Sequence, residues 1–106
     1  MRKKMNKLVR DKIPQILADS GINATFRVLA QSEYMEYLEK KLDEEVAEFH
    51  ESKDVDELVD IFEVIVTLAL QKGISAGIFD DRRTKKLRNN GGFHDRILLI
   101  DMEEDT

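Results

Sequence analysis

The sequence contains no cysteine, no tryptophan, one proline and only two histidines. The absence of cysteine excludes disulfides, thiolate metal sites and cysteine nucleophiles. Two histidines, His50 and His94, are too few for a histidine-rich zinc site. Any metal site must therefore use oxygen ligands, which the 22 acidic side chains can supply and which suit Mg²⁺, Mn²⁺ or Ca²⁺.

Long apolar runs are also missing. The most apolar stretch, residues 61–70, contains Glu63 and Thr67 and is too short to span a bilayer. The basic opening, residues 1–12, lacks the continuous apolar stretch of a secretory signal. We therefore predict a cytoplasmic protein with no membrane partner. A hydrophobic content of 42% predicts a folded chain, and the length predicts a single domain over residues 1–106.

Opposite charges are concentrated in different parts of the chain. Six of the 17 basic residues lie within the first 12 positions, and six more lie between Arg82 and Arg96. Ten of the 22 acidic residues lie between Asp43 and Glu63. A basic surface for duplex nucleic acid would have to keep this acidic middle at a distance, so we predict no duplex partner. Basic ends around an acidic centre better fit a phosphorylated small molecule bridged to carboxylates by a metal.

Periodicity and turn residues predict an all-α fold, an antiparallel helical bundle. A short helix begins at Pro14 and ends before Gly21, and three more helices span about 33–51, 55–72 and 78–88. Ser32 and Asp54 are the predicted N-caps of the two long helices. Residues 25–29 and 96–100 have the pattern of short strands, so we expect at most one small two-stranded β element.

The predicted helix over 55–72 is apolar around most of its circumference. A helix of this kind is buried on several sides. A chain of 106 residues can hardly bury it alone. We therefore predict that oligomerisation, as a homodimer or homotetramer, completes the bundle with this helix at the interface.

Two pairs of acidic residues carry the chemistry. Glu45 and Glu48 are three residues apart on one helix, as are Glu57 and Asp60 on the next, so each pair shares a face. A short loop at 52–54 folds the helices antiparallel and brings the pairs together. Two carboxylates about 5 Å apart repel by roughly 3 kcal/mol at an effective dielectric near 20. A divalent cation would reverse the sign of that interaction.

Acidic runs on helices are usually solvated faces, and this interpretation stays open for all ten acids. The paired spacing on both helices favours a metal site instead. So does the position of Glu45 beside the apolar seam formed by Tyr34, Leu38, Leu42, Val46 and Phe49.

The same acids carry a resemblance to a known family. Glu44-Glu45-x-x-Glu48 followed by Glu57-x-x-Asp60 resembles the signature of the all-α nucleoside triphosphate pyrophosphohydrolases, the MazG-like and phosphoribosyl-ATP pyrophosphohydrolase superfamily. Residues 6–14, 56–65 and 91–97 are similar to segments of a small subgroup labelled phosphoribosyl-ATP pyrophosphohydrolase-like. The resemblance extends from Asn6 to about Leu99.

The resemblance implies hydrolysis of a nucleoside triphosphate between its α and β phosphates, giving a monophosphate and pyrophosphate. It implies Mg²⁺, with Mn²⁺ as an alternative, held by Glu45, Glu48, Glu57 and Asp60. Glu44 is the candidate for orienting the attacking water beside Glu45. The candidates for binding the phosphates are Asn6, Lys7, Arg10, Lys12, Lys86 and Arg88. For each of these basic residues, solvated surface is the competing interpretation.

Departures from the family pattern keep other functions open. Asn89 and Asn90 stand where subgroup members have an acid and an arginine, and Ile61-Phe62 stands where the histidine-biosynthetic enzymes have a Tyr-His pair. Clean-up of the nucleotide pool is therefore favoured over phosphoribosyl-ATP hydrolysis in histidine biosynthesis. A non-catalytic oligomer that binds nucleotide or metal, and an interaction module whose acids only confer solubility, are the alternatives from other classes.

Overall fold

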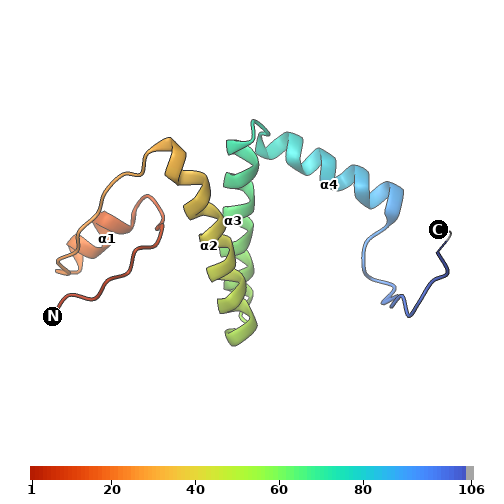
Figure 1. Cartoon of the computed structure of the whole chain (residues 1–106), viewed down its shortest axis with the longest axis horizontal. Helices are drawn as coiled ribbons and strands as arrows, with labels where there is room; N and C mark the ends of the chain where they lie inside the picture. The colour runs from red at the N-terminus through yellow and green to blue at the C-terminus, as the bar shows by residue number, and fades with distance from the viewer. Residues whose placement is uncertain (105–106) are drawn as a thin grey trace.

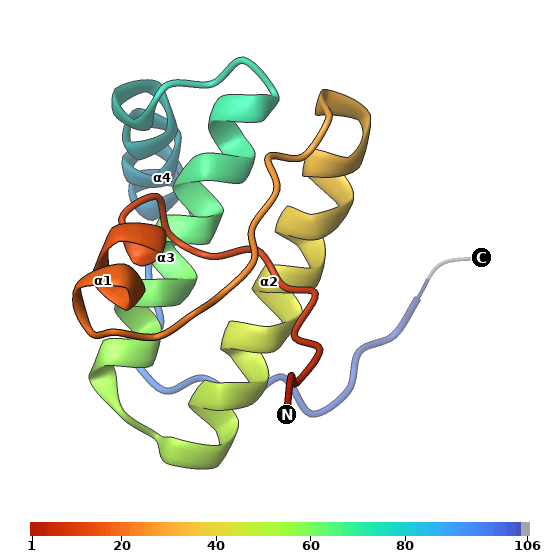
Figure 2. The same cartoon turned by 90° about the vertical axis from the view of Figure 1, so that its left-hand side faces the viewer.

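A computed structural model describes residues 1–104, and this part of the chain is all-helical, as predicted. Its helices are α1 (Ile13–Asp19), α2 (Gln31–Ser52), α3 (Val55–Gln71) and α4 (Ala76–Asn90). Helices α2 and α3 pack along each other, and Figure 1 shows α1 on one side of them and α4 pointing away on the other; the two packed helices lie side by side in Figure 2. The fold is therefore an antiparallel helical hairpin with an arm on each side.

The ends of the helices follow capping chemistry. The Asp54 carboxylate accepts a hydrogen bond from the Asp56 backbone N–H at 2.9 Å, which confirms Asp54 as the N-cap of α3. The predicted cap at Ser32 is wrong, because α2 begins at Gln31 with Ala30 as its N-cap. The Ser75 hydroxyl accepts from the Ile78 N–H at 3.3 Å, and this cap starts α4 two residues earlier than predicted.

The predicted strand pair is also wrong. Within residues 1–104 neither 25–29 nor 96–100 forms a strand, and the two segments lie toward opposite ends of the molecule (Figure 1). A β-branched segment needs a neighbouring strand to satisfy its backbone. Residues 25–29 are instead fixed to the start of α2, where Arg27 donates to both oxygens of Glu33 at 3.0 and 2.7 Å.

The hairpin is held by a small core between α2 and α3. Leu38, Val64 and Ala69 are buried, and the remaining predicted seam residues of α2 are half-buried: Tyr34, Leu42, Val46 and Phe49. A hydrogen bond between the side chains of Gln31 and Gln71, 3.2 Å long, joins the start of α2 to the end of α3. The predicted seam is therefore the inward face of α2.

The opposite face of α3 has no cover. Val55, Leu58, Val59 and Phe62 are all exposed at helical spacing, so a single chain leaves this side of α3 open to solvent. The radius of gyration is 18.6 Å, against about 13 Å for a compact chain of this length. Within the described residues, no one helix combines the length and the apolar character needed to cross a membrane; α3 and α4 meet that test only as a pair bent by 108°.

The contacts of Glu33 predict how stability depends on pH. The hydrogen bonds from Arg27 and from the Ala30 backbone N–H lower the pKa of Glu33 from 4.5 to about 2. A carboxyl with a lowered pKa in the folded state stabilises that state above its ordinary pKa, and this contribution is lost as pH falls from 4.5 toward 2. We expect Glu33→Gln to lower the melting temperature by a few degrees at pH 7 and by progressively less below pH 4.5, measured by circular dichroism.

Glu39→Gln is the matched control, because Glu39 is exposed on the same helix and forms no ion pair within residues 1–104. A gap between wild type and Glu33→Gln that stays constant from pH 7 to pH 3 would contradict the prediction.

Candidate metal centre

Two groups of carboxylates meet between α2 and α3. In the first, oxygens of Glu44, Glu45 and Glu48 all lie within 4.8 Å of one another. In the second, oxygens of Glu45, Glu57 and Asp60 do so. Glu45 belongs to both groups and joins them. The structure therefore brings together all four predicted metal ligands, in an arrangement that could hold a metal ion.

The hairpin explains this convergence. Only Lys53 and Asp54 separate the two helices, and Lys53 makes the reversal with a left-handed backbone (φ 60°). Glu48 lies one turn before the end of α2, and Glu57 lies in the first turn of α3. Residues three apart lie on one face of a helix, so Glu45 and Asp60 follow on the same sides, one turn further from the loop.

Glu45 is the centre of the cluster. It is only 5% exposed, and its Oε2 atom is buried with no hydrogen-bond partner among the described residues. Burial raises its pKa, the Lys41 ammonium acts in the opposite direction, and the charges of Glu48 and Asp60 raise the pKa further. A buried oxygen without a donor is costly in free energy. A cation between the helices would remove that cost.

Glu57 lies in the same negative field. Burial raises its pKa, and the neighbouring charges of Glu48, Glu45 and Asp60 act in the same direction. Both carboxylates are harder to ionise than usual, first because they are buried and then because like charges surround them. The donors are all hard oxygens, as Mg²⁺ and Mn²⁺ require.

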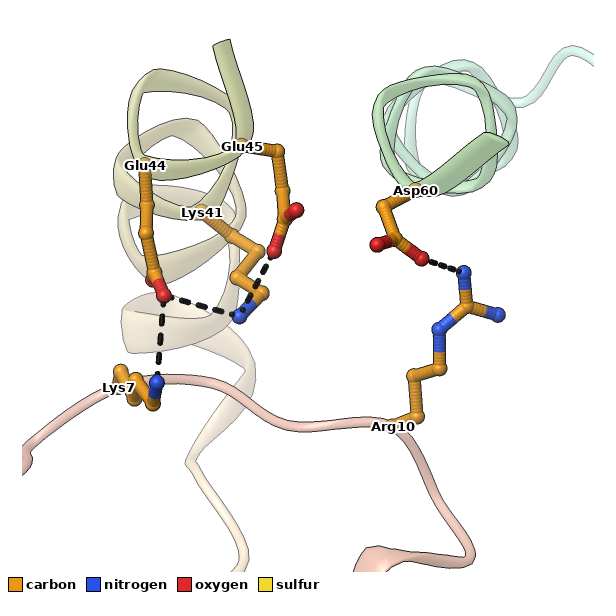
Figure 3. Close-up of polar contacts among 6 residues, drawn as sticks. All are labelled: Lys7, Arg10, Lys41, Glu44, Glu45 and Asp60. Atoms are coloured by element: carbon orange, nitrogen blue, oxygen red, sulfur yellow. Dashed lines mark hydrogen bonds and ion pairs between the residues drawn. The ribbon is translucent and has the colours of Figure 1, made fainter. Parts of the chain in front are cut away.

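Three cations border the carboxylates (Figure 3). Arg10 reaches Asp60 Oδ1 at 2.6 Å, and Lys7 reaches Glu44 Oε1 at 3.4 Å. Lys41 lies between Glu44 and Glu45, at 3.4 and 3.2 Å from their Oε1 atoms. Two of the six predicted phosphate-binding residues, Lys7 and Arg10, therefore lie beside the acids. Figure 2 shows the N-terminal segment that carries them passing in front of α2 and α3.

Sequence reasoning missed Lys41. Its signal was present, since Lys41 stands three residues before Glu44 and four before Glu45, the spacings at which helical side chains meet. Its side chain is only 16% exposed, so it belongs to the cluster and not to the solvated surface.

The other predicted phosphate-binding residues lie elsewhere. Lys86 and Arg88 are exposed on α4, which packs only on α3 within the described part of the chain, and they have no contact with the acids. Lys12 is exposed at the N-cap of α1. Asn6 is exposed and has a left-handed backbone (φ 46°) beside Lys7. One protomer therefore does not bring the α4 cations to the carboxylates.

Comparison with known proteins adds little to this geometry. Over 44 residues the chain is 50% identical to an uncharacterized protein of Mycolicibacterium smegmatis, a match that covers 42% of this chain and 45% of that protein. The chain thus spans less than half the length of this relative. No family model and no solved structure matches the chain.

Glu45→Gln tests whether the centre is a metal site. The amide keeps an oxygen for Lys41, removes one negative charge and can donate to the neighbouring carboxylates, so we expect the metal-free variant to be more stable by about 1 kcal/mol. The wild-type melting temperature should rise with millimolar Mg²⁺ or Mn²⁺, whereas that of Glu45→Gln should not.

Asp43→Asn is the matched control, because Asp43 is exposed on α2 and belongs to neither carboxylate group. It should keep the full metal response. An equal response in Glu45→Gln would exclude Glu45 as a ligand.

Proposed function

We propose that this protein is a metal-dependent nucleotide pyrophosphohydrolase that cleaves a nucleoside triphosphate between its α and β phosphates. The observation that supports it most is Glu45, a buried carboxylate with an unpartnered oxygen, shared by two carboxylate groups from facing helices. A solvated acidic face would show neither feature. The resemblance of the acidic motifs to the all-α pyrophosphohydrolases supports the same reaction.

In this proposal Glu45, Glu48, Glu57 and Asp60 hold Mg²⁺, with Mn²⁺ as a substitute. When bound, the ion would neutralise phosphate oxygens and lower the pKa of a nearby water. Glu44 lies in the same carboxylate group as Glu45 but is fixed by Lys7 and Lys41. This leaves its second oxygen free to accept a proton from that water and orient it.

In the proposed reaction, Arg10 and Lys7 bind the phosphate oxygens of the substrate. In the free protein Arg10 neutralises Asp60, and both side chains are substantially exposed, 54% and 39%. With an ion on the Asp60 carboxylate, the Arg10 guanidinium would lose this partner, because both would need the same oxygens. The guanidinium then turns to the triphosphate oxygens, which it can bind with two hydrogen bonds.

Arg10→Gln should separate these two roles. Without its competitor, the metal should bind about threefold more tightly, as expected from losing an exposed ion pair worth roughly 0.2–1 kcal/mol. Pyrophosphate release should nevertheless fall at least tenfold, because the phosphates lose a cation. Isothermal titration with Mn²⁺ and a pyrophosphate assay measure the two effects.

Lys3→Gln is the control for lost positive charge, because Lys3 is exposed on the same segment and forms no ion pair within residues 1–104. Unchanged turnover in Arg10→Gln would remove Arg10 from the site.

The decisive experiment measures pyrophosphate release across the common ribonucleoside and deoxyribonucleoside triphosphates and phosphoribosyl-ATP, with and without Mg²⁺. Wild type should release pyrophosphate only with the metal. Glu45→Gln and Asp60→Asn should abolish turnover and keep the helical circular dichroism spectrum, because each removes one charged ligand. Asp43→Asn and Glu63→Gln, exposed acids on the same two helices, should remain active.

The other outcomes identify the alternatives. Selective cleavage of phosphoribosyl-ATP would replace nucleotide-pool clean-up by the histidine-biosynthetic reaction. Metal and nucleotide binding without pyrophosphate release would support a non-catalytic binding oligomer. The absence of any metal response would leave an interaction module with acids for solubility.

A further inference from the structure

Helix α4 has few contacts within one chain. It leaves α3 after a bend of 108° and, within the described residues, packs only against α3 (Figure 1). Its 15 residues are about the length at which an isolated helix is marginal in water. Ile78 and Leu87 on α4 are about half exposed, at 50% and 46%. Within one chain these apolar side chains of α4 stay partly in contact with water.

The exposed area of the chain points the same way. The protomer exposes 9719 Å², whereas a compact monomer of 12.3 kDa exposes about 6,100 Å². The chain therefore exposes roughly 3,600 Å² more than a compact monomer would. A standard interface buries only about 800 Å² on each partner. An excess of this size fits an obligate assembly.

Apolar residues account for much of this surface. On α3 the outer stripe consists of Val55, Leu58, Val59 and Phe62, which are 45–69% exposed. After α4, the segment 97–100 exposes four consecutive aliphatic side chains by 71–87%. Monomeric proteins rarely leave such continuous apolar surface in water.

The distribution of charge on the chain indicates that the partner is a second copy of the same chain. Four cations of α4 form no ion pair within residues 1–104: Arg82, Lys85, Lys86 and Arg88. The first three line a shallow hollow of about 390 Å³ with Asn89 and Asn90. The same chain carries a carboxylate cluster with too few cations around it. Two copies related by a two-fold axis satisfy both surfaces twice, since each supplies what the other lacks.

We propose that the outer stripe of α3 and helix α4 form a self-complementary interface with a second copy of the chain, and that α4 of each copy brings Arg82 and Lys86 to the carboxylate centre of the other. The chemical role of these cations, binding substrate phosphates, rests on the proposed function. The interface itself does not.

The first test is independent of activity. Wild type should have at least twice the mass of the chain by light scattering, and Phe62→Glu should dissociate it. Val28→Glu is the control, since Val28 is 97% exposed and lies in the segment before α2, outside α3 and α4. A wild-type monomer would overturn the proposal.

Cross-linking locates α4 without relying on a variant that could unfold. The native chain has no cysteine, so a Glu51→Cys variant mixed with a Lys86→Cys variant can be joined by a short bismaleimide only between chains. Glu51 lies one turn beyond Glu48 on α2. We expect a covalent heterodimer on a denaturing gel, and much less when Glu36→Cys, exposed on α2 about 22 Å away along the helix axis, replaces Glu51→Cys. Equal yields would overturn the placement of α4.

Complementation tests the shared site. Glu45→Gln alone and the double variant Arg82→Glu/Lys86→Glu alone should both be inactive. After unfolding and refolding together in equal amounts, half of the dimers are mixed and each contains one intact site, so about a quarter of wild-type activity should return. If α4 acts within its own chain, every site carries a defect and no activity returns.

The experiments also separate the two proposals. A cross-linked dimer without pyrophosphate release on any nucleotide would exclude the hydrolase and leave the interface standing. Hydrolysis by a monomer would do the reverse.

Discussion

The main physical constraint on this structure is the repulsion among the carboxylates that lie between two packed helices. The core of the α2–α3 hairpin is small, with Leu38, Val64 and Ala69 as its buried apolar residues within 1–104. Beside it, Glu45 is buried to the same degree. A small domain has only a few kcal/mol of net stability, so an uncompensated cluster of this kind would consume much of it. Lys41, Lys7 and Arg10 offset part of the repulsion in the free protein.

Much of the helical framework could be predicted from the sequence because it is encoded locally. The apolar spacing of α2 and the Asp54 cap of α3 each depend on residues within a turn or two of each other. The pairing of Glu45 with Asp60 could be predicted for the same reason, since a short connection folds consecutive helices back antiparallel and the three-residue spacing puts each acid pair on one face.

The predictions failed where the local structure is decided by contacts between residues that are distant in the sequence. Residues 25–29 have the composition of a strand, but a strand needs a partner, and Glu33 fixes Arg27 to α2 instead. The pairing of Arg10 with Asp60 spans 50 positions in sequence, and no local pattern specifies it. Lys41 was missed for another reason. The predicted site was built from acids alone, and a lysine three and four residues before two of them has the same spacing as the solvated ion pairs found on most helices.

The carboxylates and the apolar contacts of α3 share one helical phase. Asp60 and Val64 are four residues apart and face α2 together. Inserting or deleting a single residue between them would rotate the acids by about 100° relative to the packed face. A change of chain length within α2 or α3 would therefore separate the acids from the packed face, whereas the same change in a loop outside the hairpin would leave the site intact.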